Sequence, residues 1–158
     1  MPYLIDGNNL LGSWGGPSGK GSDRRAEVVR RVAAFCRTRG ARAVVVFDGK
    51  PLRDERPAQE LGPVSVRVPP PGRDADSVIR ALVDAAREPR DLIVVTSDKA
   101  LYSYAHTRGA RILRAHEWNA LERAPAKRPA SRRPPVTAED KPEREDDIEG
   151  WLARFERR

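Results

Sequence analysis

The sequence is poor in the residues that build most zinc and redox centres. Its 158 residues include one cysteine, Cys36, and two histidines, His106 and His116. A single cysteine excludes an internal disulfide and a Cys-x-x-Cys redox pair, and the spacing of the two histidines does not fit a helical zinc motif. Any metal ion that this chain holds must therefore have mainly oxygen ligands.

Long hydrophobic runs are missing as well. The longest uninterrupted apolar runs, residues 32–36 and 43–47, contain five residues each, whereas a transmembrane helix needs about 18. The first residues contain no basic cluster and reach a carboxylate at Asp6, so they do not resemble a secretory signal. We therefore expect a cytoplasmic protein with no membrane partner.

Acidic residues are outnumbered by basic ones. The chain has 30 Lys and Arg against 23 Asp and Glu, a formal net charge of +7 and a pI near 10.2. Most of the excess is arginine, whose guanidinium group forms paired hydrogen bonds with phosphates and carboxylates. The charge favours a polyanionic partner such as nucleic acid, although an excess of this size also serves solubility.

Short runs rich in β-branched residues alternate with segments of helical periodicity, which is typical of a mostly parallel sheet flanked by helices. The pattern predicts strands at residues 3–5, 43–47, 64–68, 92–96 and 111–113. It predicts helices from the cap Asp23 to Gly40, from residues 74–76 to 86, over 99–108 and over 116–123. We therefore predict one α/β domain over residues 1–123.

The composition changes after this domain. Residues 124–142 are rich in Pro, Ala, Arg, Ser and Lys and have no apolar periodicity, which predicts a basic linker. In residues 143–158, Ile148, Trp151, Leu152 and Phe155 recur at helical spacing, which predicts an amphipathic helix. This helix either packs on the domain or docks on a partner, and the sequence leaves both alternatives open.

Four aspartates occupy equivalent places, after a predicted strand or at the entry to the next helix: Asp6, Asp48, Asp76 and Asp98. The carboxyl ends of parallel strands meet at one edge of the sheet, where ligands of such folds bind. Carboxylates gathered there repel one another unless a cation neutralises them, and Mg²⁺ or Mn²⁺ prefers carboxylate and water oxygens. Each aspartate alone also has a structural explanation as a turn residue or helix N-cap.

A carboxylate-bound divalent ion on a basic protein favours metal-assisted hydrolysis of a phosphodiester bond. Basic residues near the predicted site would hold the nucleic-acid backbone, or are solvated surface charges: Lys20, Lys50, Arg73 and Lys99. Trp14 and Tyr102 either stack on unpaired bases or pack against the domain. The glycine-rich residues 15–22 do not form a P-loop, because Trp14 stands where the first glycine is required.

Several stretches of the chain resemble a known family. They are Tyr-Leu-Ile-Asp-Gly-Asn-Asn at residues 3–9, Val-Val-Val-Phe-Asp-Gly at 44–49, Asp-Ala-Asp-Ser-Val-Ile at 74–79, and Val-Val-Thr-Ser-Asp at 94–98, followed by Gly-Ala-Arg at 109–111. In content, order and spacing they resemble the NYN domains of the PIN-like nuclease superfamily, and most closely the bacterial YacP-like branch. The resemblance covers nearly all of residues 1–122 and leaves out the linker and terminal helix.

This resemblance implies a PIN-like three-layer α/β/α sandwich that acts as a divalent-metal endoribonuclease, with the four aspartates on the family's acidic positions. It also implies mRNA cleavage associated with the ribosome. Asn8, Asp74 and Ser97 lie within the matching stretches and join the four basic residues as candidates for substrate contact. Many NYN domains carry a second acid where this chain has Ala100, so the number of metal ions stays open.

Three alternatives differ in class. A non-catalytic RNA- or ribosome-binding module would keep the fold and the acids without the activity. A receiver-like domain needs an acidic pair after the first strand and a lysine after the last, but here Gly7 follows Asp6 and Arg114 follows Leu113. An acyl-transfer enzyme needs a nucleophile elbow, which the sequence does not contain.

Overall fold

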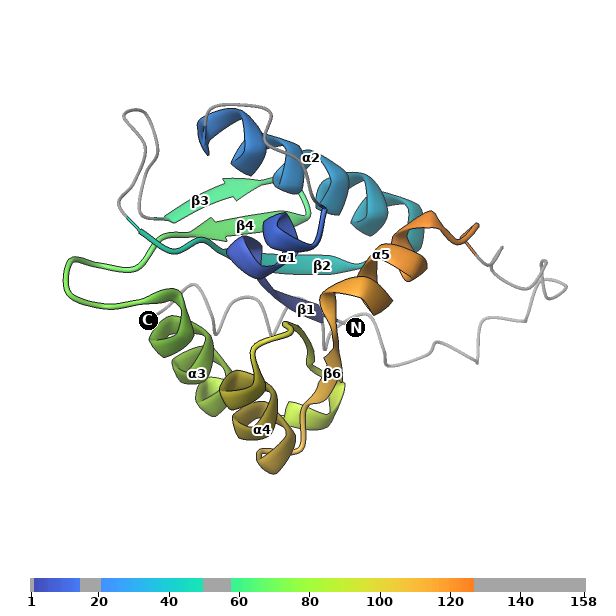
Figure 1. Ribbon diagram of the computed structural model, residues 1–158. Helices are drawn as coiled ribbons and strands as arrows, with labels where there is room; N and C mark the ends of the chain where they lie inside the picture. Colours follow the sequence, from blue (N-terminus) through green and yellow to red (C-terminus); the bar gives the residue numbers. More distant parts are fainter. Residues whose placement is uncertain (1, 15–20, 50–57, 127–158) are drawn as a thin grey trace, which may run out of the picture. The chain divides into compact units, whose positions relative to one another are not determined.

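The computed structural model describes residues 2–14, 21–49 and 58–126 (Figure 1). The chain divides into two units, Met1–Ala124 and Pro125–Arg158, and the description below concerns the first. The predicted linker at 124–142, from residue 127 onward, and the predicted helix at 143–158 lie outside the described residues. Lys20 and Lys50 also lie outside them.

The centre of the domain is a sheet whose order is β3-β4-β2-β1-β5-β6. Its strands are β1 Pro2–Asp6, β2 Arg42–Val46, β3 Ala58–Leu61, β4 Val64–Arg67, β5 Ile93–Val95 and β6 Arg111–Leu113. All neighbouring strands are parallel except β3, which pairs antiparallel with β4 at the edge. The chain builds outward from β1 on one side and then on the other, so the strand order reverses at β1.

Helices cover both faces of this sheet. They are α1 Gly7–Ser13, α2 Gly21–Arg39, α3 Ala75–Ala85, α4 Lys99–Thr107 and α5 Ala115–Arg123, with a short 3₁₀ turn at Pro89–Asp91. Figure 1 shows α1, α2 and α5 on one face and α3 and α4 on the other. The predicted three-layer α/β/α fold is confirmed. No helix in the described ranges is long and apolar enough to cross a membrane.

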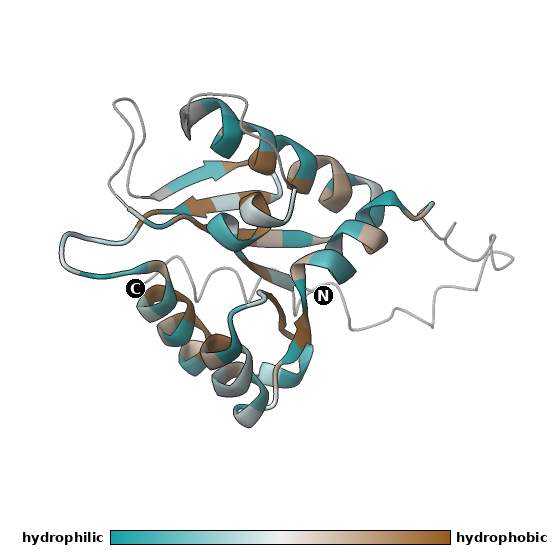
Figure 2. Cartoon of the chain, in the orientation of Figure 1, coloured by the Kyte–Doolittle hydropathy of each residue, from teal (hydrophilic) through white to brown (hydrophobic). Residues whose placement is uncertain are grey.

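The core lies between the sheet and its helices, where Figure 2 shows the hydrophobic residues of the strands and of the inward helix faces. Ile5 and Val45, paired across β1 and β2, are fully buried. Burial of an aliphatic side chain of this size contributes about 1.5–3 kcal/mol. Where α2 and α5 cover β1, the ring centroid of Trp118 on α5 lies 4.4 Å from that of Phe35 on α2 and 5.4 Å from that of Tyr3 on β1. These contacts join α2 and α5 to β1.

The structure adds two elements that the sequence pattern did not predict. Strand β3 has the sequence Ala-Gln-Glu-Leu, and α1 the sequence Gly-Asn-Asn-Leu-Leu-Gly-Ser. An edge strand needs no apolar alternation, and α1 consists largely of poor helix formers whose helical conformation depends on its cap and on the burial of Leu10. The cap predicted at Asp23 is wrong, because α2 begins at Gly21 and Asp23 lies in its first turn.

A candidate acidic site at the carboxyl edge of the sheet

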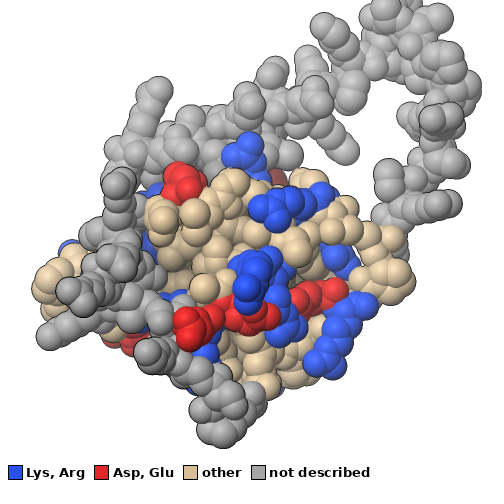
Figure 3. All heavy atoms as spheres, turned by 90° about the horizontal axis from the view of Figure 1, so that it is seen from above, with Lys and Arg blue, Asp and Glu red and all other residues tan. Residues whose placement is uncertain are grey.

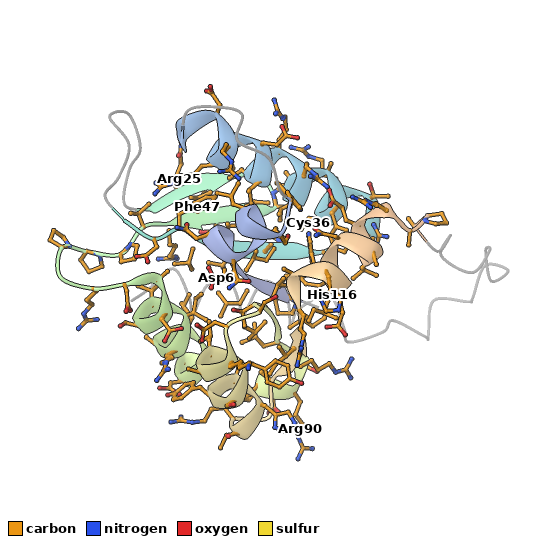
Figure 4. All side chains as sticks on the ribbon, viewed as in Figure 1. Asp6, Arg25, Cys36, Phe47, Arg90 and His116 are labelled. Carbon is orange, nitrogen blue, oxygen red and sulfur yellow. The ribbon has the colours of Figure 1, made fainter. Side chains whose placement is uncertain are left out.

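Asp6 lies where the sheet changes direction. It ends β1 and is the N-cap of α1, its Oδ1 accepting the Asn9 N–H at 3.2 Å. Its Oδ2 accepts a hydrogen bond from the Thr96 hydroxyl at 3.4 Å, just beyond the end of β5. The helix that follows β1 covers one face and the helix that follows β5 covers the other, so Asp6 lies at the switch point where open α/β sheets bind ligands (Figure 4).

The environment of Asp6 disfavours its negative charge. Burial raises the pKa of this carboxyl group above its ordinary value of 3.8, and the hydrogen bonds from Asn9 and Thr96 oppose the rise. The negative charges of Asp76 and Asp98 raise the pKa of Asp6 further. The structure therefore brings three of the four predicted aspartates, each from a different part of the chain, within electrostatic reach of one another.

Asp98 is held by α4 and by a buried threonine. As the N-cap of α4, it accepts the Leu101 N–H on Oδ1 at 2.9 Å. Its own backbone N–H donates to the Thr96 hydroxyl oxygen at 3.2 Å. Thr96 is 0% exposed. Because its hydroxyl takes part in both hydrogen bonds, it connects the Asp6 carboxylate with the backbone of Asp98. Sequence analysis did not select Thr96, although a hydroxyl residue between an apolar strand and an aspartate was a usable signal.

The other two predicted acids are engaged differently. Asp76 lies in the first turn of α3, with its Oδ2 2.9 Å from Nε of Arg80. That nitrogen does not direct its N–H at the oxygen, so the contact is ionic rather than a hydrogen bond. The Oδ1 of Asp48 accepts the Gly49 N–H at 2.9 Å and the Ala75 N–H at 3.4 Å. Asp48 therefore joins the loop after β2 to the start of α3.

Two asparagines in α1 fasten the strand ends around Asp6. The Asn8 Oδ1 accepts the backbone N–H of Asp48 at 3.0 Å, beyond β2. The Asn9 Oδ1 accepts the backbone N–H of Ser97 at 2.9 Å, beyond β5. Because β2 and β5 flank β1 on opposite sides, the first turn of α1 holds all three strand ends together.

A close contact brings α1 down onto the sheet. A Cβ atom added to Gly7 would lie 2.5 Å from two ring carbons of Phe47 and 3.1 Å from Cγ1 of Val45. The Arg25 guanidinium carbon lies 5.2 Å from the centroid of the Phe47 ring, and Nη2 of Arg25 donates to the Asp48 carbonyl oxygen at 2.6 Å (Figure 4). Arg25 was not predicted, since nothing in the sequence distinguishes it from the other arginines of α2.

The remaining predicted contact residues that the structure describes lie around this edge. Asp74 is the N-cap of α3, and hydrogen bonds from the Ser77 hydroxyl and N–H lower its pKa. Arg73 and Lys99 are exposed beside the two capping aspartates. Ser97 is exposed, and its Oγ accepts the Ala115 N–H at 3.0 Å.

The two aromatic candidates differ. Trp14 packs against the core, with the Arg31 guanidinium carbon 3.8 Å from the centroid of its ring, and it donates its indole N–H to Asn119 at 2.6 Å. Tyr102, on α4, stays half-buried at the surface. The packing alternative therefore describes Trp14, while Tyr102 keeps accessible ring surface.

Charges on the face above the sheet are mixed. Figure 3 looks down on the side where α2 runs in Figure 1 and shows basic and acidic side chains next to one another. Arg30 pairs with Glu27, and Arg31 pairs with Glu122 of α5 at 2.7 Å. Part of the positive charge of α2 is thus neutralised within the domain.

The donor set suits a hard divalent cation without being assembled around one. Within residues 2–14, 21–49 and 58–126, no three Asp, Glu, His or Cys side chains are already grouped as ligands of one ion. The acids around Asp6 nevertheless offer carboxylate oxygens, which Mg²⁺ and Mn²⁺ prefer. A positive ion there would favour the ionised form of Asp6 and so oppose the burial and the like-charge repulsion that raise its pKa.

Comparison with known proteins gives consistent matches. A family model described as the YacP-like NYN domain matches residues 3–149. The crystal structure of Rae1 (YacP) from Bacillus subtilis has a TM-score of 0.64 and 26% sequence identity, covering 77% of this chain and 73% of that chain. The structure of its tryptophan-to-leucine mutant has a TM-score of 0.63 at 23% identity, covering 77% and 74% of the two chains. No curated protein matches.

Proposed function

Since the chain belongs to the family of YacP-like NYN domains, a branch of the PIN-like nucleases, we propose that it is a divalent-metal-dependent endoribonuclease that hydrolyses RNA phosphodiester bonds. The observation that carries this proposal is the position of Asp6 at the switch point of the sheet, within reach of the charges of Asp76 and Asp98. Acids gathered at this edge repel one another, which does not stabilise the fold. A bound cation would give this arrangement a function.

We propose that Asp6, Asp48, Asp76 and Asp98 hold one or two Mg²⁺ or Mn²⁺ ions, directly or through water. Bound by these carboxylates, a divalent ion would ionise a water for attack and would offset the charge that develops on the scissile phosphate. Arg73 and Lys99, exposed at this edge, and Lys20 and Lys50, which lie outside the described residues, are the proposed contacts with the RNA backbone. Asn8, Asp74 and Ser97 complete the proposed contacts with substrate.

The second layer of the site keeps the acids in place. Thr96 orients the Asp6 carboxylate and fixes the backbone of Asp98, because its hydroxyl contacts both. Asn8 and Asn9 set the positions of the strand ends that carry Asp48 and Ser97. Arg80 offsets the charge of Asp76 through its ionic contact. Such preorganisation reduces the rearrangement needed when ion and substrate bind.

The biological substrate that we propose is mRNA in the cytoplasm, on or near the ribosome. Support comes from the resemblance to the YacP-like branch and from the net charge of +7. We propose that the predicted linker at 124–142 and the predicted helix at 143–158 serve in docking. The alternative function is a non-catalytic RNA- or ribosome-binding module. It is favoured by one observation: in the described residues, no three acidic, His or Cys side chains are grouped as ligands of one ion.

Cleavage of a labelled single-stranded RNA tests the proposal. Purified protein is incubated with Mn²⁺, Mg²⁺ or EDTA, with and without ribosomes, as wild type and as Asp6→Asn and Asp98→Asn. Asp91→Asn is the matched control, because Asp91 is exposed and precedes β5, at the opposite end of the strand from the site.

We expect metal-dependent cleavage by the wild type and by Asp91→Asn, and none by the other two variants. Cleavage that persists in both site variants would place the activity elsewhere. RNA binding that falls with salt, without cleavage in any condition, would establish the non-catalytic alternative. Cleavage only in the presence of ribosomes would support the docking role of residues 124–158.

A further inference from the structure

Three side chains gather on the surface next to Asp98. Tyr102 and His106 lie one turn apart on α4, with ring centroids 6.3 Å apart and planes only 9° from parallel. The guanidinium carbon of Arg114, the N-cap residue of α5, lies 5.4 Å from the centroid of the Tyr102 ring. We refer to Tyr102, His106 and Arg114 as the Tyr102 group.

The backbone places this group at the acidic edge of the sheet. The Tyr102 N–H donates to the carbonyl oxygen of Asp98 at 2.9 Å, so the ring begins one helical turn beyond a site acid. Arg114 directly follows β6, which runs parallel to β5 with Leu113 opposite Val95. Arg114 therefore leaves the sheet at the same edge as Asp98. The Ser97 hydroxyl, which accepts the Ala115 N–H, ties the two segments together.

The Tyr102 group lies at the surface, and its ring contacts are made among its own three members. Tyr102 is half-buried, and His106 and Arg114 are exposed. Tyr104, two residues further along α4, donates its hydroxyl to Asp84 at 2.6 Å and has the guanidinium groups of Arg80 and Arg108 each 4.8 Å from its ring. That arrangement joins α3 to α4. In the contacts described, the Tyr102 group makes no comparable connection to α3, so packing of α4 against α3 does not explain its arrangement.

We propose that the Tyr102 group is a stacking site for one unpaired nucleobase of the RNA substrate, an inference that rests on the proposed function. Bases stack on tyrosine rings and on guanidinium planes, and a guanidinium also pairs with the adjoining phosphate. Such a surface recognises the flat face shared by all bases and carries no pattern of hydrogen bonds that selects one of them.

This site makes the substrate single-stranded near the cleaved bond. A base within a duplex is already stacked on its neighbours and must leave the helix to reach Tyr102, which costs free energy. The acidic site and the Tyr102 group are separated by one turn of α4, so the stacked base belongs to a nucleotide near the scissile phosphate. The Tyr102 group therefore selects unpaired RNA with little preference for sequence.

Equilibrium binding in EDTA, where no cleavage is expected, tests the stacking site. The probe is a fluorescent 12-nucleotide single strand of uridines, compared with a set of strands in which one abasic nucleotide is moved along the sequence. The protein variants are Tyr102→Ala, Tyr102→Trp and Arg114→Gln, with Tyr104→Phe as the control on the same helix. The unfolding midpoint of each variant is measured in parallel.

We expect Tyr102→Ala to weaken binding by about 5- to 150-fold, the range found for loss of one base–aromatic stack, and Tyr102→Trp to bind like the wild type. One abasic position should weaken wild-type binding by a similar factor and have no further effect on Tyr102→Ala. If Tyr102→Ala does not fold, Arg114→Gln replaces it in the test. In that variant we expect the abasic position to weaken binding less than it does in the wild type.

Two results would overturn the inference. One is wild-type binding that no abasic position weakens. The other is an abasic penalty that is the same in the wild type and in the Tyr102 or Arg114 variants. The cleavage assay separates these results from failure of the proposed nuclease, since binding is measured without cleavage. Cleavage without this coupling removes the stacking site alone, and coupling without cleavage removes the nuclease alone.

Discussion

The contact between Gly7 and Phe47 makes Gly7→Ala a sensitive test of how α1 is mounted on the sheet. A Cβ at this position would lie 2.5 Å from two carbons of a ring that is 0% exposed, closer than any ordinary contact allows. The ring has little freedom to move, because it is buried and the Arg25 guanidinium carbon lies 5.2 Å from its centroid. The helix or the ring must therefore shift.

We expect Gly7→Ala to lower the free energy of unfolding by about 1–3 kcal/mol, the usual cost of overpacking a core. The matched control is Gly12→Ala in the same helix, where an added Cβ has no neighbour within 4 Å. There the substitution restricts the unfolded chain and improves helix propensity, so we expect a gain of about 0.5–1 kcal/mol. The two changes are chemically identical and should have opposite signs.

Chemical denaturation of the single variants and of Gly7→Ala combined with Phe47→Leu measures the effect. If the clash is with the ring, the double variant should be more stable than the sum of the two single changes predicts, by about 0.5–3 kcal/mol. Cleavage should fall by more than the loss of folded protein, because Gly7 lies between Asp6 and Asn8. Equal stability of Gly7→Ala and wild type, or additive effects in the double variant, would refute this account of the contact.

Three further predictions concern single side chains. Thr96→Val removes the hydroxyl that contacts Asp6 and Asp98, so cleavage should fall sharply and the free energy of unfolding should fall by about 1–3 kcal/mol. Unchanged cleavage would contradict the positioning role. Because the pKa of Asp6 is raised in the folded state, its ionisation weakens folding as the pH rises from 3.8 through that raised value. In EDTA, Asp6→Asn should therefore gain stability relative to the wild type between pH 4 and pH 7 in denaturant titrations, and a constant difference would argue against it. Burial raises the pKa of the Cys36 thiol to about 11, so a disulfide reagent at pH 8 should modify it only at the rate of unfolding, and fast labelling of the native protein would disagree.

The parallel strands of the sheet were predictable because each is a short apolar run rich in β-branched residues that alternates along the chain with helical segments. The predicted strands at 3–5 and 111–113 correspond to β1 at Pro2–Asp6 and β6 at Arg111–Leu113. Helix α1 and strand β3 were not predictable in the same way, since neither has the periodicity of its class. Tertiary contacts form them, through the Asp6 cap, the burial of Leu10 and the pairing of β3 with β4.

In the candidate site, too, some features were predictable from the sequence and others were not. Strand ends could be located from the sequence, so Asp6 and Asp98 were predicted to lie at one edge. In the structure, the charges of Asp76 and Asp98 act on the buried Asp6 carboxyl group. Which way a side chain turns depends on partners that are distant in sequence. The contacts of the Asp48 carboxylate with the Ala75 N–H, and of the Arg25 guanidinium with the Asp48 carbonyl, therefore came only from the structure.

Helix capping and a role in the site are not competing explanations for Asp6 and Asp98. Each is the N-cap of a helix through Oδ1, which fixes the side-chain rotamer and directs the carboxylate at the edge of the sheet. The partial positive charge of a helix N-terminus stabilises a carboxylate, which offsets part of the cost of keeping two more acids nearby. Asp74 shows the limit of this argument, because it caps α3 in the same way while exposed, with a pKa lowered by Ser77 rather than raised by neighbouring acids. Capping alone therefore does not distinguish the proposed site acids. Asp6 differs from Asp74 because it combines capping with burial and with the like charges of Asp76 and Asp98.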